Sequence, residues 1–376
     1  MQADGLIQGL RLDSVDDVLG ERHTRFFGEG FKRVSYSLAD ITVVPDATDT
    51  RDATGTTGST GAAGSPGAEG STGQVHATVG IHLPDTWSRK GETLQRPHLS
   101  TLDGMIVAAR LTGVYVAHAR RLPADARFRV RGLRIKAGNA PDEEGLERFR
   151  VSARLRSTVV SPDAPGQSIT TMDCTVGAMS VQVEAEHPTG EEHRAEGSYA
   201  DSAELDGPWN TAPFGVSHHE RAQYLEDVRA DASEGTADAR LTLVDGQDVA
   251  KGQGPTAVDL FVCALQLGQV LLYELDNLTR AESNTLWMRR TTIEAVSASD
   301  GVVTSDGSAS DGVATSDGSA SDGVATSDGP RSDDRFRVAL GRSTALPTAE
   351  GTWRTAVITA SLGDLRMSCN VAHLLP

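Results

Sequence analysis

The sequence predicts an α+β fold in which two antiparallel sheets each wrap one long apolar helix. The first observation is a repeat, because LDGMIVAARLTGVY at 102–115 aligns without gaps on VDLFVCALQLGQVL at 258–271. The second is that segments alternating between apolar and polar residues follow each helix, which is typical of strands with one buried face. The third is the length of 376 residues, 38% of them hydrophobic, which can supply the cores of two such units.

The composition excludes several classes of function. A formal charge of −17 argues against binding to nucleic-acid phosphates, which requires a basic surface. The three cysteines lie far apart and form no CxxC pair, which predicts reduced thiols and no structural zinc site. Residues 1–20 are too polar for a signal peptide, and no run of about 18 apolar residues predicts a membrane helix. We therefore expect a soluble, cytoplasmic protein without a nucleic-acid or membrane partner.

The first half of the chain predicts two strands, a long helix and three further strands. Residues 1–20 suggest a short amphipathic helix before them. The strand at 26–44 is rich in β-branched and aromatic residues, and the strand at 74–84 alternates between apolar and polar positions. The apolar helix is expected over residues 99–120. Three alternating segments after it predict the strands 128–138, 149–160 and 169–187.

The second half repeats this pattern. A strand is expected at 239–249 and the second long helix at 256–280. Four further segments predict the strands 286–296, 336–346, 352–363 and 365–375. A sheet of antiparallel strands around one long helix is the hotdog fold, and two in tandem make a double hotdog. By analogy with that fold, we expect the site where the N-terminus of a helix in one unit meets the other unit, beside a tunnel for an acyl chain.

Two low-complexity stretches interrupt the predicted units. Residues 45–73 are almost wholly Ala, Thr, Gly, Ser, Asp and Pro, and residues 297–329 are three near-identical copies of eleven residues. Neither can bury enough apolar surface to offset chain entropy, so both are predicted to be disordered loops. Residues 188–237 are acidic and rich in turn residues except at 208–225, which predicts a linker with one docked segment. The expected organisation is an N-terminal unit at 1–187, this linker, and a C-terminal unit at 238–376.

A polar, charged loop leads into the first long helix. It contains Trp87 beside the basic residues Arg89, Lys90 and Arg96, and it ends at His98. A histidine at this place is either a general base or a helix cap. The basic residues form either a site for a phosphate group or a solvated loop. The sequence leaves both questions open.

Each long helix carries an acid and a long polar residue seven positions apart, which places the two on one face. They are Asp103 and Arg110 in the first helix, and Asp259 and Gln266 in the second. An acid that opens a helix is either a cap or a site residue, and a buried glutamine requires a hydrogen-bond partner. Both alternatives stay open for each of these residues.

The sequence contains no motif for a cofactor or a metal. It has neither a GxGxxG segment after a strand nor a GxxxxGK[ST] phosphate-binding loop. His218 and His219 are adjacent, but no carboxylate stands at a spacing that would complete a metal site. We therefore expect a function that requires no cofactor and no metal.

Three segments resemble the avirulence D (AvrD) family. They are FFGEGFKRVSY from residue 26, WSRKGETLQRPHLSTLD from residue 87 and AVDLFVCALQLGQVLLYEL from residue 257. The resemblance covers most of the chain outside the two low-complexity stretches. More distantly, the helices resemble those of hotdog proteins that make A-factor-type γ-butyrolactones and of polyketide dehydratases. The dehydratase pattern HxxxGxxxxP is absent, because Leu-Ser-Thr-Leu follows His98 with no Gly or Pro in register.

The AvrD family is associated with syringolides, so the resemblance implies an enzyme of secondary metabolism, a transferase. It would join a 3-ketoacyl thioester, carried by an acyl carrier protein or coenzyme A, to a sugar-type alcohol and close a butenolide-like ring. The expected catalytic residues are His98, Asp103, Asp259 and Gln266. The expected substrate-binding residues are Trp87, Arg89, Lys90, Arg96 and Arg110. A non-catalytic hotdog that binds an acyl or lactone ligand and a dehydratase-like enzyme are the alternatives, and a homodimer is left open.

Overall fold

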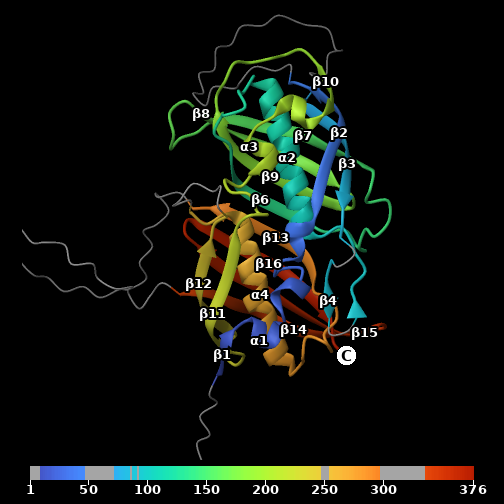
Figure 1. Cartoon of the computed structure of the whole chain (residues 1–376), viewed down its shortest axis with the longest axis vertical. Helices are drawn as coiled ribbons and strands as arrows, with labels where there is room; N and C mark the ends of the chain where they lie inside the picture. The colour runs from blue at the N-terminus through green and yellow to red at the C-terminus, as the bar shows by residue number, and fades with distance from the viewer. Residues whose placement is uncertain (1–8, 47–71, 85–86, 91–92, 247–253, 297–334) are drawn as a thin grey trace, which may run out of the picture.

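Two long helices lie one beyond the other, and strands curve around each of them (Figure 1). The computed structural model describes residues 9–46, 72–84, 87–90, 93–246, 254–296 and 335–376. The helices are α2 (Thr101–Ala119) and α4 (Ala257–Asp276), which confirms both predicted helices with slightly shorter bounds.

Both helices begin with the same capping box. The Ser100 hydroxyl accepts from the backbone N–H of Asp103 at 3.1 Å, and the Asp103 carboxylate accepts from the N–H of Ser100 at 2.7 Å. Thr256 and Asp259 form the equivalent pair of bonds at 3.2 and 2.8 Å. Each box satisfies two backbone donors that a helix N-terminus leaves unpaired. The acids that open the repeated helices are therefore helix caps.

The strands of the described chain form one antiparallel sheet of 14 strands, in the order β1-β11-β12-β14-β15-β16-β13-β6-β9-β8-β7-β3-β2-β10. The half of the sheet around α2 contains β2 (Ser35–Val44), β3 (Gln74–His82), β6 (Arg129–Lys136), β7 (Phe149–Val160), β8 (Gln167–Val176), β9 (Met179–Pro188) and β10 (Gly197–Asp201). The half of the sheet around α4 contains β1 (Leu10–Ser14), β11 (Ala222–Asp231), β12 (Thr236–Val244), β13 (Trp287–Ala295), β14 (Phe336–Thr348), β15 (Gly351–Leu362) and β16 (Leu365–Leu374). Shorter elements are α1 (Asp16–Leu19), α3 (Pro208–Thr211), the 3₁₀ helices η1 (Arg22–Thr24), η2 (Gly30–Arg33) and η3 (Ser202–Leu205), and the hairpin of β4 (Arg89–Lys90) and β5 (Thr93–Leu94).

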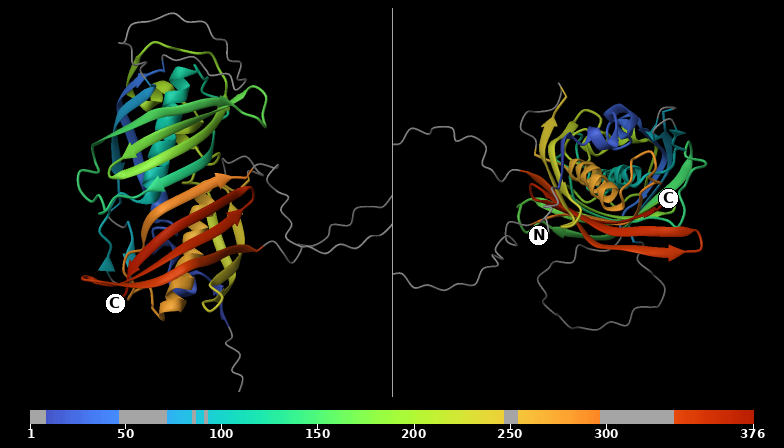
Figure 2. Two further views of the ribbon diagram at one scale, coloured as in Figure 1. Left: turned by 180° about the vertical axis from the view of Figure 1, so that it is seen from behind. Right: turned by 90° about the horizontal axis from the view of Figure 1, so that it is seen from below.

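The two halves of the sheet meet where β13 pairs antiparallel with β6 (Figure 2). We expected two separate sheets, and this pairing corrects that prediction. The physical reason is that β13 and β6 would otherwise each expose a row of unpaired backbone groups. The strand order is the same in each half, β12-β14-β15-β16-β13 in one and β3-β7-β8-β9-β6 in the other. The chain has a hotdog-like α+β fold.

A second repeat shows that the similarity of the halves extends beyond the helices. The sequence Arg-Phe-Arg-Val begins at Arg148 and again at Arg335. Arg148 donates to the Asp40 carboxylate at 2.8 Å, and Arg335 donates to the Asp227 carboxylate at 2.6 Å. Both aspartates have a left-handed backbone, with φ of 51° and 48°, and both lie at a β-bulge. Such a bulge bends the strand, and it recurs at the same place in β2 and β11.

Each end of the sheet is completed by a strand from the other half of the chain. β1 pairs with β11, and β10 pairs with β2. The short helix predicted within residues 1–20 is present as the four-residue α1, but the strand β1 precedes it, which the sequence did not predict. Residues 188–237 are more than the predicted linker, since they contain β10, α3 and β11. The two short strands cover edges of β2 and β11 that would otherwise be unpaired. The division into folding units at 1–187 and 238–376 stays a prediction.

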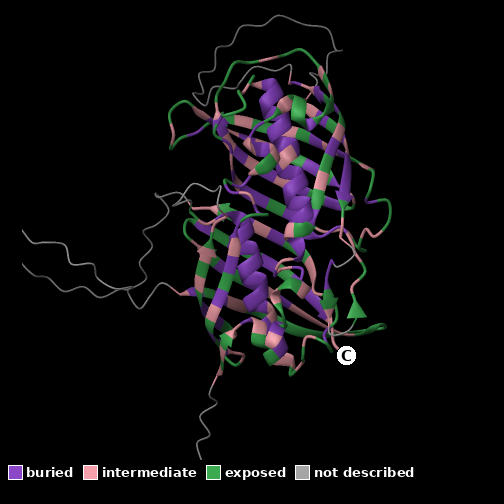
Figure 3. Ribbon diagram, viewed as in Figure 1, coloured by how far each residue is buried: buried purple, intermediate pink, exposed green. Residues whose placement is uncertain are grey.

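Nearly all residues of α2 and α4 are buried, as Figure 3 shows. By length and composition α4 could cross a membrane, which the sequence analysis did not recognise. The surrounding strands cover its apolar surface, so α4 is a core helix of this fold. The predicted loops at 45–73 and 297–329 lie almost entirely outside the described residues, but the strands β2 and β3 that flank the first of them pair antiparallel.

The three cysteines are free and buried, in agreement with the expected reduced thiols. Burial raises the pKa of Cys174 and of Cys369 to about 12 and that of Cys263 well above its usual range. A thiol with a raised pKa is a poor nucleophile, so these side chains act as small apolar core residues.

The middle of α2 packs directly against the fully buried side chain of Trp209 in α3. A Cβ atom added at Gly113 would lie 2.0 Å from Cβ and 2.5 Å from Cγ of Trp209. Trp209 is 0% exposed, and its indole N–H donates to the carbonyl of Leu205 at 2.7 Å, so the ring has no room to retreat. The helix therefore requires glycine at this position.

We expect Gly113→Ala to destabilise the protein by about 1–3 kcal/mol. Alanine improves helix propensity by about 1 kcal/mol, but overpacking against an immobile ring outweighs that gain. The midpoint of urea unfolding measures the effect. Gly104→Ala is the matched control in the same helix, because its new Cβ meets the flexible end of Met179 at 2.9 Å. Equal stability of both variants would contradict the prediction.

Candidate active site

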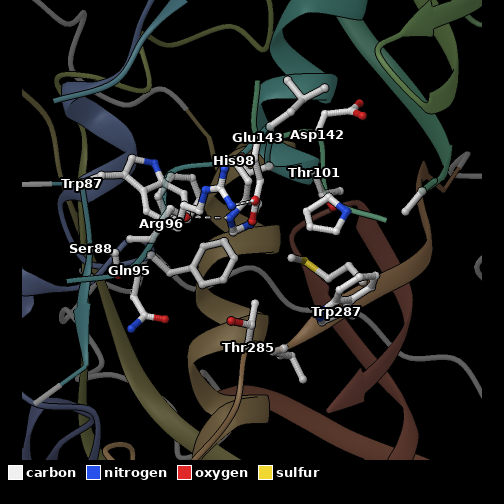
Figure 4. A pocket seen from close by; sticks show the side chains of 18 of the residues that line it. Trp87, Ser88, Gln95, Arg96, His98, Thr101, Asp142, Glu143, Thr285 and Trp287 are labelled. Carbon is white, nitrogen blue, oxygen red and sulfur yellow. Dashed lines mark hydrogen bonds and ion pairs between the residues drawn. The ribbon is translucent and has the colours of Figure 1, made fainter. Parts of the chain in front are cut away.

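A cavity of about 380 Å³ lies between the N-terminus of α2 and the loop that connects α4 with β13 (Figure 4). The described parts of the loop before α2, residues 87–90 and 93–98, form one side of it. Residues 25–27 and 280–288 contribute further lining from other parts of the chain. A cavity of this size is typical of a site for a small molecule. The loop before the first long helix, which the sequence left open as a binding site or a solvated loop, therefore lines a cavity.

Large apolar side chains form much of the cavity wall. The rings of Phe26 and Trp87 lie 5.0 Å apart, and Trp87 contacts His98 edge to face at 4.8 Å. Further apolar residues of the wall are Phe27, Leu99, Met179, Leu286, Trp287 and Met288. Such a wall suits the apolar part of a ligand.

His98 lines this cavity and is held in one orientation. Its Nδ1 lies 3.2 Å from the backbone carbonyl oxygen of Arg96. A carbonyl oxygen only accepts, so in the neutral ring this bond places the proton on Nδ1 and a lone pair on Nε2. No described residue forms a hydrogen bond with Nε2. This tautomer is the one in which a histidine acts as a general base through Nε2.

The first two backbone N–H groups of α2 have no partner in the described part of the chain. Ser100 accepts from Asp103 through its hydroxyl and from Gly104 through its carbonyl. The N–H groups of Thr101 and Leu102 remain, and Thr101 lines the cavity. Unpaired N–H groups at a helix N-terminus stabilise negative charge on a nearby oxygen. The cavity therefore combines a candidate base with candidate donors for an oxyanion.

Four basic side chains line the same cavity, with Arg25, Lys90 and Arg280 in its wall and Arg96 at its exposed rim. Arg25 is 3% exposed; it donates to Gln266 Oε1 at 2.9 Å and forms an ion pair with Asp16. Burial lowers the pKa of Arg25 to about 10, against the attraction of Asp16. Burial also lowers the pKa of Lys90 to about 8, and the positive charge of Arg280 adds to this effect. This concentration of positive charge favours an anionic ligand or transition state.

Lys90 joins two loops rather than offering its charge to a ligand. Its ammonium group donates to the carbonyls of Ser283 and Asn284, at 3.0 and 2.6 Å, and to the Ser283 hydroxyl at 3.3 Å. These bonds use all three donors of an ammonium group. Arg280 donates to the Leu19 carbonyl at 3.2 Å, and its other donors are unassigned among the described residues. Arg280 is therefore better placed than Lys90 to bind an anion.

The exposed rim of the cavity carries an ion pair. Arg96 is 66% exposed and lies 2.6 Å from the Glu143 carboxylate. Asp142 also lines the cavity, where its carboxylate accepts from the backbone N–H of Ala178 at 2.7 Å. Exposed ion pairs contribute little free energy, so Arg96 is a rim residue with its charge compensated.

Three of the four predicted catalytic residues lie outside the cavity lining. Asp103 is fully buried, where its carboxylate accepts from the Tyr36 hydroxyl at 2.6 Å and burial raises its pKa. Asp259 accepts from Arg221 at 3.0 Å and from Gln223 at 2.8 Å. These bonds and the two capping boxes occupy both aspartates, which corrects their assignment as catalytic residues in favour of structural roles.

Gln266 is the third of these residues. It is 2% exposed, and its Oε1 accepts from Arg25. A buried amide requires a hydrogen-bond partner, and Arg25, which precedes η2, is that partner. Gln266 therefore positions Arg25 at the cavity, and of the four predicted catalytic residues His98 alone lines it.

The predicted substrate-binding residues divide into two groups. Trp87, Lys90 and Arg96 line the cavity. Arg89 is exposed and lies outside the lining residues, and Arg110 lines a different cavity. The prediction that all five form one binding site is therefore wrong. Arg89 and Lys90 are successive residues of a strand, so their side chains point to opposite sides. Arg110 lies more than two helical turns after the N-terminus of α2, which is the end that borders the cavity.

Sequence reasoning missed several lining residues, among them Arg25, Gln269 and Arg280. Gln269 carries a signal that could have found it, because it is a polar residue within the apolar run of α4. Arg25 and Arg280 carry no such signal. They reach the cavity only because the segment after β1 and the loop after α4 fold back onto it.

Comparison with known protein families identifies the family of this chain. Residues 10–310 match the model of the Pseudomonas avirulence D protein (AvrD) family. The chain belongs to the AvrD family. This match extends across both long helices and across the segments that line the cavity, so the AvrD family resemblance read from three short segments is confirmed. A search of curated proteins finds no match.

Several solved structures are similar to this AvrD family member at low identity. A TesB protein of Mycobacterium avium has 9% identity and a TM-score of 0.31, covering 80% of this chain and 93% of its own. The 12:0-ACP thioesterase of Umbellularia californica has 13% identity and a TM-score of 0.34, covering 80% and 94%. A hot dog protein of unknown function from Alicyclobacillus acidocaldarius has 9% identity and a TM-score of 0.29, covering 81% and 94%. TM-scores below 0.5 carry no argument, so the hotdog-like assignment rests on the sheet and helices described above.

Proposed function

We propose that this protein is an enzyme that joins a 3-ketoacyl thioester to a sugar-type alcohol and cyclises the product to a butenolide-like molecule. The observation that carries the proposal is the position of His98 just before α2, because no described residue pairs with its Nε2 or with the first two N–H groups of the helix. Apolar walls and buried cations surround this pair in one cavity. Membership of the AvrD family, which is associated with syringolides, supports this class of product.

In the first step His98 Nε2 accepts the proton of the alcohol hydroxyl. The alcohol oxygen attacks the thioester carbonyl carbon, and the negative charge develops on the carbonyl oxygen near the N–H groups of Thr101 and Leu102. The C–S bond then breaks, and the thiolate takes the proton from the imidazolium. The products of this step are an ester and a free thiol.

Ring closure uses the acidic carbon between the two carbonyl groups of the acyl chain. A base removes one proton from this carbon, which then attacks a ketone of the alcohol part, and loss of water leaves a C=C bond in the ring. His98 is the candidate base for this step as well. The positive charges of Arg25 and Arg280 stabilise the enolate that forms first.

The alternative of a dehydratase-like enzyme finds less support. That chemistry pairs a histidine base with a carboxylic acid in the same cavity. Asp103 and Asp259 are buried in capping boxes and hydrogen-bond networks instead. The two carboxylates that do line the cavity are engaged elsewhere, because Asp142 accepts from the backbone N–H of Ala178 and Glu143 pairs with Arg96. A non-catalytic protein that binds an acyl or lactone ligand requires only the apolar cavity. Binding of the acyl substrate without turnover would support this alternative.

The test incubates the purified protein with a 3-ketoacyl coenzyme A and either xylulose or dihydroxyacetone phosphate. Mass spectrometry is expected to detect an ester or lactone that requires both substrates, with release of one equivalent of thiol. Thr285→Trp, which fills the cavity, should abolish the product, whereas Thr359→Trp on the exposed face of β15 should not. Acyl binding without product would support the ligand-binding alternative and sink the proposed reaction.

A further inference from the structure

A second cavity has a volume of about 670 Å³, and Tyr36 is among the residues that line it. Its lining comes from the start of β2, the middle of α2, the end of α3 and the segment that follows α3 as far as residue 220. None of its lining residues lines the candidate active site. The second cavity is therefore separate, and what it binds is independent of the proposed reaction.

Polar atoms of three lining side chains are buried without a partner in the described chain. They are both ring nitrogens of His218, Nε of Arg110 and Oδ1 of Asn210. A buried polar atom without a hydrogen bond costs about 1–3 kcal/mol, and folded proteins contain few of them. Here the four atoms belong to three side chains that line one cavity, which is large enough for a ligand. Their convergence is the mark of a binding site rather than of a packing defect.

Arg110 contributes a half-buried positive charge that forms no ion pair with any described residue. Its guanidinium donates to the backbone carbonyl of Tyr36 at 3.1 Å and to the Ser202 hydroxyl at 3.2 Å, both neutral acceptors. Burial lowers the pKa of Arg110, although the group stays charged at neutral pH. Buried charges in proteins are normally paired. An anionic group in the cavity would complete this site.

His218 adds one donor and one acceptor. Its ring is 6% exposed, stacks on Phe31 at 6.5 Å and contacts His219 at 3.9 Å, which fixes its plane. Burial lowers the pKa of His218 to about 3, and the nearby positive charges of Arg110 and Lys32 act in the same direction. The neutral imidazole therefore has one N–H and one lone pair to offer.

The remaining polar groups of the cavity define the rest of the ligand. Asn210 uses its amide nitrogen on the carbonyls of Ser202 and Leu205, so its unpaired Oδ1 can only accept. Tyr36 donates its hydroxyl proton to Asp103 and has none left for a ligand. A ligand that fits must accept from the guanidinium and donate to the amide oxygen.

We propose that the second cavity binds a small organic anion that also carries a hydroxyl group, such as a hydroxy acid. Its anionic oxygens lie against Arg110, and its hydroxyl groups bond to Asn210 Oδ1 and to the ring of His218. Glu220 also lines the cavity, and as an exposed residue it stays solvated. The shared chemistry is an anionic group beside a hydroxyl, whether the anion is a carboxylate or a phosphate.

The test is isothermal titration calorimetry of the full chain with gluconate, with glycerol 3-phosphate and with glucose. Gluconate or glycerol 3-phosphate is expected to bind, and the stronger of the two identifies the anion. Glucose has comparable hydroxyl groups without the charge, so it should bind at least tenfold more weakly. Equal binding of glucose, or binding of neither anion, would overturn the proposal.

Variants locate the binding in this cavity. Arg110→Gln should weaken binding of the anion at least tenfold, and it is compatible with the helix because Gln266 holds the equivalent position in α4. Arg148→Gln, in an exposed ion pair, is the matched control and should bind as the native protein does. His218→Phe keeps the ring and removes both nitrogens, so it serves as a second test if Arg110→Gln does not fold. Unchanged binding in a folded variant of either residue would contradict the site.

Discussion

Replacing His98 with alanine is expected to slow ester formation by about 10²- to 10⁴-fold, the range that a general base contributes. The reason is the lone pair on Nε2, which the bond from Nδ1 to the Arg96 carbonyl leaves directed away from the backbone. Alanine removes this base and leaves the N–H groups of Thr101 and Leu102 in place. Binding of the acyl thioester should therefore change little while the rate falls. The measurement is the rate of thiol release at saturating substrate.

His76→Ala is the matched control for this experiment. His76 is exposed on β3, and Gln74, at 3.2 Å, is the one described residue with a hydrogen bond to its ring. His76 does not line the cavity, so its replacement removes an imidazole elsewhere. Wild-type rates are expected for this variant. If His98→Ala formed product as fast as His76→Ala, the proposed reaction could stand but the base would be a different group. Circular dichroism and the unfolding midpoint confirm that both variants are folded.

The second large effect concerns stability. Asp259→Ala is expected to destabilise the protein by about 3–5 kcal/mol, the cost of removing one partner from a buried ion pair. Asp259 and Arg221 are each 1% exposed, and their side chains lie 3.0 Å apart. The substitution also deprives the Gln223 amide and the Thr256 backbone N–H of their acceptor. Loss of the capping box alone would cost about 1 kcal/mol, so most of the effect comes from the buried donors of Arg221 and Gln223 that lose their acceptor.

Urea unfolding of Asp259→Ala and of Asp173→Ala measures this difference. Asp173 forms an ion pair with Arg156 at 3.6 Å, but both side chains are more than half exposed, so its loss should cost less than about 1 kcal/mol. A small effect in both variants would show that Asp245, the other acidic partner of Arg221, compensates the charge on its own. That result would contradict the dominant role of the Asp259 pair.

The local sequence determined the long helices and most of the strands. Apolar runs with an acid at the third position predicted α2 and α4, since the capping box and the burial of the helix are both encoded within a few residues. Alternation predicted the strands that follow each helix for the same reason. The position of His98 close to the N-terminus of α2 also follows from the sequence, because only two residues separate it from the helix.

The tertiary structure decided the features that depend on contacts between distant segments. The pairing of β13 with β6 made one sheet of two, and the exchange of β1 and β10 between the halves covered its ends. Sequence analysis could not separate a cap from a catalytic acid, because Asp103 and Asp259 have the same local pattern in either role. Their partners Tyr36 and Arg221 come from strands and loops that are remote in sequence. Sequence patterns also could not place Arg25 and Arg280 at the candidate active site. The folding of the whole chain brings these two side chains to the cavity, and a local pattern does not predict contacts between distant segments.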